Sequence, residues 1–190
     1  RRQRPGPGMT SAAPLSRDEL LELLEDLSQT LARSGERARM FVVGGAAMSL
    51  GYDQTRTTRD VDALFEPKPC VHSAVADVAA RHGLGPDWVN DAAKGFMPGP
   101  DPDPRTVYES DHLLVQVASP EYLLAMKLHS ARPGRDIDDA AILYRTAGCT
   151  SPEQALDLLE QRFPGRLLPR HQYLVHEIAA QAETDGDISR

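Results

Sequence analysis

The chain has 190 residues, of which 41% are hydrophobic and 26% are charged, a composition typical of a globular rather than a disordered protein. Its formal net charge of -7 argues against a protein that coats nucleic acid non-specifically, because such proteins present a basic surface. All apolar runs are shorter than the ~18 residues of a membrane helix, so we expect a cytoplasmic protein without a membrane partner.

Soft metal ligands are sparse in this sequence. The two cysteines, Cys70 and Cys149, have no neighbours at the spacing of a zinc site, and the six histidines are scattered along the chain. Any metal chemistry therefore has to use carboxylates, which bind hard ions such as magnesium.

The first 82 residues alternate between helical and strand patterns. Residues 1–14 are rich in Arg, Pro and Gly without periodicity, and we expect them to form a disordered lead. Ser16 and Glu19 have the spacing of a capping box, ahead of leucines at helical spacing. The pattern predicts helices over 16–33, 46–50 and 71–82, and strands over 40–43 and 60–65.

The second half begins with a segment rich in Gly, Pro and Asp, residues 83–105, which predicts a long loop that is functional or mobile. A β-hairpin is expected over 106–117, and Ser119 with Pro120 starts the next helix. Three more helices are predicted over 136–146, 152–161 and 169–183. We therefore predict an α/β fold: a core with a small mixed sheet in residues 15–118, a helical C-terminal part packed on it over 119–183, and a tail over 184–190.

Gly44 and Gly45 lie where the predicted strand Met40–Val43 turns into a helix. A helix that starts at glycines leaves its first backbone N–H groups open, and together with the helix dipole these groups form a seat for phosphate. A tight turn with small residues for close packing explains the same pattern.

Asp60 and Asp62 are two residues apart on the second predicted strand, so both side chains should point to one face. Two adjacent carboxylates repel each other unless a cation lies between them. Magnesium bound by one or two carboxylates and by substrate phosphates meets that need. The alternative is a strand face that water solvates.

Together the two features resemble the DNA polymerase β-like nucleotidyltransferase superfamily, in which a phosphate seat precedes a strand with paired carboxylates. The residues Gly44-Gly45-Ala46, followed by Arg56-Thr57-Thr58-Arg59-Asp60-Val61-Asp62, look like the AbiEii and MenT branch of nucleotidyltransferase toxins. The resemblance covers about residues 38–146. It implies a magnesium-dependent enzyme that uses a nucleoside triphosphate (NTP).

The resemblance also implies roles in the second half of the chain. Lys127 corresponds to a family lysine that neutralises triphosphate charge, and Asp139 belongs to a segment like the family's Arg-Asp-x-x-Asp signature. Related enzymes usually carry a third carboxylate on a later strand, where this chain has Gln116. Asp139 is therefore the first candidate for the general base, with Asp111 and Glu109 behind it. Without the resemblance, Lys127 reads as a solvated helix lysine.

The expected acceptor is RNA, with the 3′ end of transfer RNA as the site that the MenT-like toxins imply. Arginines are candidates for contacts to its phosphates, although a solvated surface explains most of them equally well. These residues are Arg56, Arg59, Arg132, Arg135, Arg166 and Arg170.

An antitoxin is the expected protein partner, because a toxin of this kind has to be restrained. The resemblance offers phosphorylation beside the catalytic aspartates as one way to restrain it. Thr58 is favoured over Thr57, because alternation along the strand places it on the face of Asp60 and Asp62. Both threonines also suit an extended segment simply because they are β-branched.

Two other functions fit the same sequence. One is nucleotidyl transfer to a protein hydroxyl or to a small molecule. The other is a non-catalytic binding module such as an antitoxin, against which the presence of both aspartates speaks.

Overall fold

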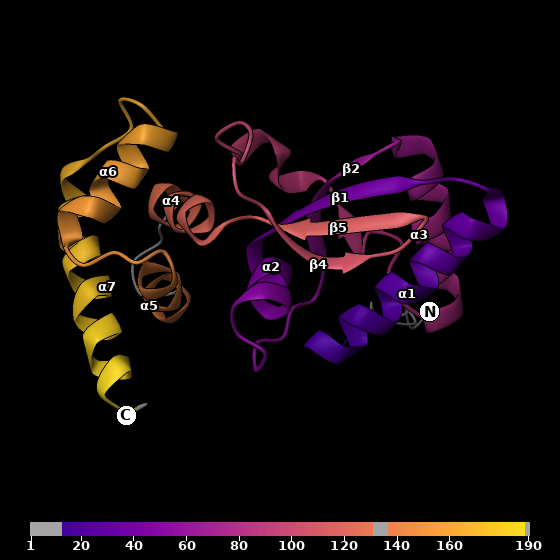
Figure 1. The fold of residues 1–190 in the computed structure, drawn as a ribbon, viewed down its shortest axis with the longest axis horizontal. Helices are drawn as coiled ribbons and strands as arrows, with labels where there is room; N and C mark the ends of the chain where they lie inside the picture. The colour runs from indigo at the N-terminus through magenta and orange to yellow at the C-terminus, as the bar shows by residue number, and fades with distance from the viewer. Residues whose placement is uncertain (1–12, 131–136, 189–190) are drawn as a thin grey trace, which may run out of the picture.

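The computed structural model describes residues 13–130 and 137–188 of the chain. Its centre is one five-stranded mixed sheet with the strand order β3-β2-β1-β5-β4 (Figure 1). Strand β1 pairs antiparallel with β2 and parallel with β5, while β3 runs parallel to β2 and β4 antiparallel to β5. The strands are β1 (Ala38–Val43), β2 (Val61–Glu66), β3 (Val89–Asn90), β4 (Arg105–Glu109) and β5 (Leu113–Val117).

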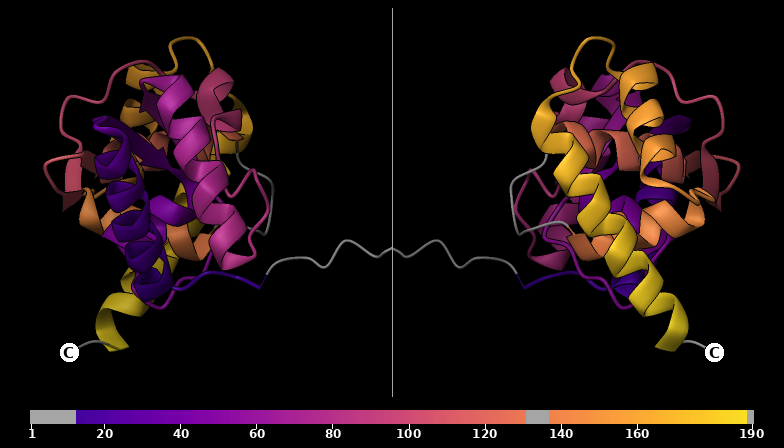
Figure 2. Two further views of the ribbon diagram at one scale, coloured as in Figure 1. Left: turned by 90° about the vertical axis from the view of Figure 1, so that its right-hand side faces the viewer. Right: turned by 90° about the vertical axis from the view of Figure 1, so that its left-hand side faces the viewer.

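One face of the three central strands, β2, β1 and β5, is buried. Met40 of β1 pairs with Phe65 of β2 and with Val115 of β5, and all three side chains are at most 2% exposed. The helices α1 (Arg17–Ser34) and α3 (Lys68–His82) lie side by side on one side of the molecule (Figure 2). Leucines at helical spacing give α1 its buried stripe, and the capping box at Ser16 and Glu19 starts it as predicted.

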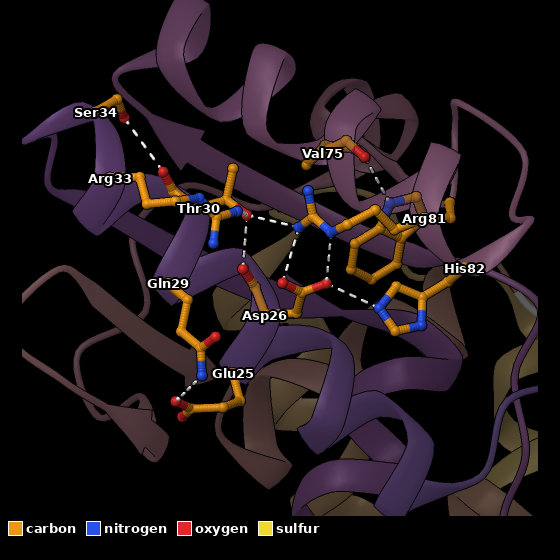
Figure 3. Close-up of polar contacts among 10 residues, drawn as sticks. Glu25, Asp26, Gln29, Thr30, Arg33, Ser34, Val75, Arg81 and His82 are labelled. Atoms are coloured by element: carbon orange, nitrogen blue, oxygen red, sulfur yellow. Dashed lines mark hydrogen bonds and ion pairs between the residues drawn. The ribbon is translucent and has the colours of Figure 1, made fainter.

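A polar clamp joins α1 to α3 (Figure 3). The guanidinium of Arg81 donates to both carboxylate oxygens of Asp26, at 2.8 and 3.1 Å, and to the hydroxyl of Thr30 at 2.7 Å. His82 Nε2 lies 2.8 Å from the same carboxylate. These contacts, with the hydrogen bond from Arg81 as the main cause, lower the pKa of Asp26 below its ordinary value.

The helical half stands beyond the carboxyl ends of β1 and β5 (Figure 1). The connection to it is fixed by Tyr122, whose ring meets Phe41 of the sheet edge-on at 5.6 Å and whose hydroxyl donates to the carbonyl of Gly99. In the described residues no helix is both long and apolar enough to cross a membrane. The remaining helices are α2 (Gly44–Gly51), α4 (Pro120–Ser130), α5 (Ile137–Thr146), α6 (Pro152–Arg162) and α7 (Pro169–Ile188), with the 3-10 helix η1 (Ala92–Phe96).

The predicted fold class is confirmed: an α/β fold with a five-stranded mixed sheet and a helical C-terminal half. Several boundaries differ from the prediction. Helix α3 begins at Lys68 rather than 71, because Pro69 falls in its first turn, where a missing N–H costs nothing. Helix α7 continues through the predicted tail to Ile188. The predicted lead lies outside the described residues except for positions 13 and 14.

The predicted long loop over 83–105 is the main error in the fold prediction. This segment contains β3 and η1, and Trp88 within it is 3% exposed and donates from its indole to the carbonyl of Val75. Its proline-rich end is tied to the start of α4, since both Asp101 oxygens accept hydrogen bonds from Ser119. Buried anchors at both ends thus fix a segment that composition alone marks as irregular.

Candidate active site

The two glycines stand at the carboxyl end of β1 and begin α2. Gly44 has φ +67°, a left-handed conformation that favours glycine, and a Cβ added there would lie 3.1 Å from Asp62 Oδ2. A Cβ at Gly45 would lie 2.9 Å from Thr58 Oγ1. The absence of side chains at this turn therefore lets one carboxylate and one hydroxyl approach the backbone closely.

The start of α2 is also chemically open. Its N-cap residue, Val43, makes no side-chain capping hydrogen bond, and no acidic residue lies in the first turn of the helix. Uncapped N–H groups at a helix start attract anions through direct hydrogen bonds and through the helix dipole. The structure thus gives the turn the features expected of a phosphate seat.

Asp62 lies on β2 opposite Val43, the last residue of β1, and is half-buried. Asp60 is exposed and lies just before the strand, so the prediction that both acids belong to one strand is wrong by one residue. Burial raises the pKa of Asp62 above its ordinary value, and the charge of Asp60 raises it further. An acid whose charge is disfavoured by burial and by its neighbour Asp60 is thus placed beside the glycine turn.

Asn90 completes this group, although it was not among the site residues predicted from the sequence. It pairs with Asp62 across the short contact between β2 and β3, and its amide nitrogen lies 3.5 Å from Asp60 Oδ2. A hydrogen bond from the Asn90 side chain to Asp62 acts to lower the pKa of Asp62, whereas burial and the charge of Asp60 raise it. The hydrogen bond from this amide is the smallest of the three effects, so the pKa of Asp62 stays above its ordinary value.

Thr58 is held in place from two sides. Its backbone donates to and accepts from Leu15 in an isolated bridge, at 2.9 and 2.6 Å, and its hydroxyl donates to the carbonyl of Asp60 at 3.0 Å. The side chain is half-buried against Gly45, whereas Thr57 is exposed. Of the two threonines, Thr58 is the one that the structure brings to the glycine turn.

A second polar group joins α4, α5 and the segment before β2. Lys127 Nζ lies 2.9 Å and Arg56 Nη2 3.0 Å from the same oxygen of Asp139, Oδ2. The side chain of Asp139 is only 5% exposed, so the two cations offset the cost of burying its charge. Two predicted site residues, Lys127 and Asp139, are thereby brought together, and Arg56 joins them.

A pocket of about 330 Å³ opens between the sheet and the helical half. Three of its walls are the glycine turn with Asp62, the helix η1 and the last turns of α4. Its lining residues are Val43, Gly44, Asp62, Ala92, Ala93, Phe96, Met126, His129 and Ser130. A larger hollow of about 770 Å³ lies at the other end of the sheet, away from the predicted site.

The two reserve candidates for the general base lie at that other end. Asp111 and Glu109 line the larger hollow, beside Leu113, which pairs with Ala38 at the start of β1. The glycine turn follows the opposite end of the same strand. Gln116 lies on the face of the sheet that carries Asp62. Gln116 pairs with Phe41 and Asp62 pairs with Val43, and these two partners are two residues apart on β1, so their side chains point to the same face.

The arginines predicted to contact RNA divide into three groups. Arg56 is engaged with Asp139, and Arg59 is exposed beside Asp60. Arg132 and Arg135 lie outside the described residues. Arg166 and Arg170 lie near His129 of the pocket and, after burial, are the next cause that lowers the pKa of that histidine below its ordinary value.

The carboxylates of Asp60 and Asp62 are hard oxygen donors, the kind that magnesium binds. In residues 13–130 and 137–188, no three or more His, Cys, Asp or Glu side chains cluster in a way that could hold a metal without help. A pair of carboxylates is nevertheless what magnesium uses when substrate phosphates and water supply its remaining ligands. The residues at Asp60 and Asp62 fit that cation, and a nucleotide would have to complete its shell.

Comparison with known proteins places these residues in a family. One similar solved structure is that of an antigenic nucleotidyltransferase-like protein from Paracoccidioides brasiliensis, with 16% identity, 93% of each chain covered and a TM-score of 0.32. A search of curated proteins gives no significant match. The family model described as "Nucleotidyltransferase of unknown function (DUF6036)" matches residues 18–147, more than half of the chain and a range that includes every residue from Gly44 to Asp139. The chain belongs to this family of nucleotidyltransferases.

Proposed function

We propose that the protein transfers a nucleoside monophosphate from an NTP to the 3′ end of a transfer RNA and that it acts as the toxin of a toxin–antitoxin system. The observation that carries the transfer reaction is the approach of Asp62 to Gly44, which unites an acidic site with a phosphate seat. The RNA acceptor and the toxin role rest on the resemblance of the segment 56–62 to the AbiEii and MenT branch.

Asp60 and Asp62 would hold magnesium, which when bound neutralises charge on the triphosphate. The N–H groups at the start of α2 bind the phosphates, and the ammonium of Lys127 offsets charge that builds on the departing pyrophosphate. An acceptor hydroxyl forms the new bond to the α-phosphorus, the bond from that phosphorus to the pyrophosphate oxygen breaks, and the hydroxyl proton passes to water. Positioning and charge neutralisation supply most of the rate increase.

Asp139 takes a positioning role in this proposal rather than the role of base. Both Lys127 and Arg56 contact Oδ2, the oxygen that faces them, so the carboxylate holds two cations in a fixed arrangement. A carboxylate engaged in this way orients Lys127 toward the site. Its loss should therefore weaken catalysis through Lys127.

The test is to incubate the protein with magnesium and each of four α-labelled NTPs, with total RNA in one set of reactions and total protein in another. Label in a band of transfer RNA, absent with Asp60→Ala, is the expected result. Label in protein, or in a small molecule alone, would contradict the RNA acceptor and favour the other transferase functions. No label in any acceptor, with the folded protein, would contradict the transfer reaction itself.

The toxin role has its own test. Expression of the wild-type chain should arrest bacterial growth, while the Asp60→Ala variant should be tolerated at an equal protein level. Harmless expression of an enzyme that is active in vitro would contradict this role.

Control by an antitoxin would act at Thr58. A phosphate on its hydroxyl would add a charge of about -1.5 to -2 beside Gly45, where the triphosphate would otherwise bind. We expect an increase of one phosphate in the intact mass of the chain after co-expression with the antitoxin, and no increase for Thr58→Val. An unchanged mass in an inhibited complex would mean that the antitoxin blocks the site by occlusion.

A further inference from the structure

Phe96 is one of the few large hydrophobic side chains that remain exposed in the described residues, at 66%. Single exposed hydrophobic side chains are common and need no explanation by themselves. This one, however, lines the 330 Å³ pocket whose opposite wall includes Asp62 and Gly44. The exposed ring therefore lies at the same pocket as the proposed metal and phosphate groups.

The helix that carries Phe96 is anchored to the acidic pair. Asn90 Oδ1 accepts a hydrogen bond from the backbone of Ala92 at 3.0 Å, and the amide nitrogen of the same residue reaches Asp60. Lys68 of α3 forms an ion pair with Asp91, just before η1. One asparagine thus links the start of η1 to the acids, so the position of Phe96 is set relative to them.

The wall contributed by α4 is suited to an uncharged planar group. His129 stacks on Phe163, with ring centres 4.1 Å apart and an angle of 10° between the planes. Burial, and then the nearby Arg166 and Arg170, lower the pKa of His129, which favours its neutral form near pH 7. The hydroxyl of Ser130, also in this wall, donates to the carbonyl of Met126. This wall therefore offers a bound group mainly van der Waals contact, since the Ser130 hydroxyl already donates its hydrogen bond within the protein.

We propose that this pocket is the subsite for the nucleobase of the bound NTP. The base stacks on Phe96, and Met126 and His129 of α4 contact it from the opposite side. The inference rests on the proposed transferase function, since Asp62 and Gly44 would hold the other end of the same nucleotide. A volume of about 330 Å³ lies at the lower end of the ~300–1,000 Å³ of small-molecule sites. Stacking accepts every base, so the subsite contributes affinity without strong choice among the four NTPs.

The test compares ATP with inorganic tripolyphosphate, which has the phosphates without the base, by calorimetric titration in magnesium. Phe96→Ala should weaken ATP binding by roughly 5- to 150-fold, the range for loss of one stacked base, and leave tripolyphosphate binding unchanged. Phe96→Trp should keep ATP affinity near the wild-type value. Tyr173→Ala is the matched control, because Tyr173 is an aromatic side chain on α7 that is 80% exposed, and it should change neither ligand.

Several results would overturn the subsite. One is equal affinity of ATP and tripolyphosphate for the wild type, and another is unchanged ATP affinity in Phe96→Ala. Equal loss of both ligands in Phe96→Ala would show that the ring supports the phosphate seat rather than the base. If the folded wild type binds neither ligand, the proposed function fails and the subsite fails with it. Because Phe96 is exposed, Phe96→Ala should fold, and its circular dichroism spectrum checks this.

Discussion

Two aspartates of this protein have opposite electrostatic surroundings. In the clamp between α1 and α3, two nitrogens of the Arg81 guanidinium donate to the carboxylate of Asp26, and the pKa of Asp26 is lowered. At the glycine turn, Asp62 is half-buried beside another acid, and its pKa is raised even though a hydrogen bond from Asn90 acts to lower it. The first arrangement stabilises a carboxylate with the chain's own cation. The second arrangement has an acidic neighbour in place of a cation, and perturbed acids of this kind are typical of functional sites, which is why our proposal places magnesium there.

Asp139 shows that the contrast is not simply one of burial. It is more buried than Asp62, yet Lys127 and Arg56 both contact it. The chain therefore supplies cations to buried acids where the structure requires them. At Asp62 the neighbouring charge is that of a second acid, Asp60, and under our proposal magnesium would supply the missing positive charge.

The largest effect should come from removing one acid of the pair. Asp60→Ala or Asp62→Ala should lower transfer by at least about 10³-fold, because magnesium would lose one of two protein ligands, while the fold persists. Transfer of label from NTP measures this, and circular dichroism checks the fold. Asp77→Ala, an exposed aspartate of α3, is the control and should retain full activity. Full activity in either site variant would contradict the metal assignment.

Lys127 provides the next test, because it belongs both to the cationic group and to the proposed triphosphate site. Lys127→Ala should reduce kcat/KM by about 10²-fold, the typical loss of one electrostatic contact to a transition state. Lys127→Arg should recover little of it, because a guanidinium differs from an ammonium in shape and reach. Steady-state kinetics with varied NTP measure both. Unchanged kinetics in Lys127→Ala would make this residue structural.

The lysine variant also has a structural consequence that needs a separate control. Without Lys127, the buried Asp139 loses one of the two cations that contact it in the described residues, so the variant should unfold more easily. Adding Asp139→Asn removes the buried charge and should restore part of the lost stability but none of the lost activity. Recovery of activity in the double variant would contradict a direct role for Lys127.

Local patterns in the sequence were enough to predict much of this molecule. The capping box and leucine stripe of α1 depend on residues three and four apart, and the structure confirms both. The glycines and the acids were also found locally, because each group spans only a few residues. Their meeting at Gly44 and Asp62 followed from the family resemblance rather than from the spacing.

Contacts between distant segments were not predictable. Arg56 meets Asp139 across 83 positions of the chain, and Asn90 reaches Asp60 across 30. Strand β3 has only two residues, too few to show a period, and it lies in a segment whose glycines and prolines favour a loop reading. Phe96 was missed for the same reason, since a 3-10 helix of five residues has no clear amphipathic pattern.

Removal of Arg81 tests whether the Asp26 clamp has a structural role only. Arg81→Ala should lower the free energy of unfolding by about 1 kcal/mol, the scale of a well-placed ion pair that is partly exposed, and the melting temperature by about 2–4 °C. Nucleotidyl transfer at 25 °C should not change. Thermal unfolding and the transfer assay measure the two effects. A large loss of activity at unchanged stability would contradict the purely structural role.

The acid dependence of the same variant follows from the sign of the Asp26 shift. A lowered pKa means that Asp26 contributes stability in full above its unfolded pKa of about 3.9, and that this contribution is lost as the pH falls through the lower, folded value. The stability difference between wild type and Arg81→Ala should therefore be constant from pH 5 to pH 7 and shrink below about pH 4. Urea unfolding across this range measures it, and a difference that grows on acidification would contradict the assignment.

The smallest effect concerns the acidic pair without its cation. Asp60→Asn keeps the size of the side chain and removes the charge that acts on Asp62, so the variant should melt on the order of 1–3 °C above the wild type in EDTA. Magnesium with a non-hydrolysable NTP analogue should then raise the melting temperature of the wild type but not that of the variant. The variant lacks one of the two carboxylates that would hold magnesium, so it should not bind magnesium and the nucleotide together. Asp77→Asn is the control, since its loss of one exposed charge should leave the response to magnesium intact. If Asp60→Asn melts below the wild type in EDTA, the two acids do not destabilise each other, and the contrast with the Asp26 clamp loses its physical basis.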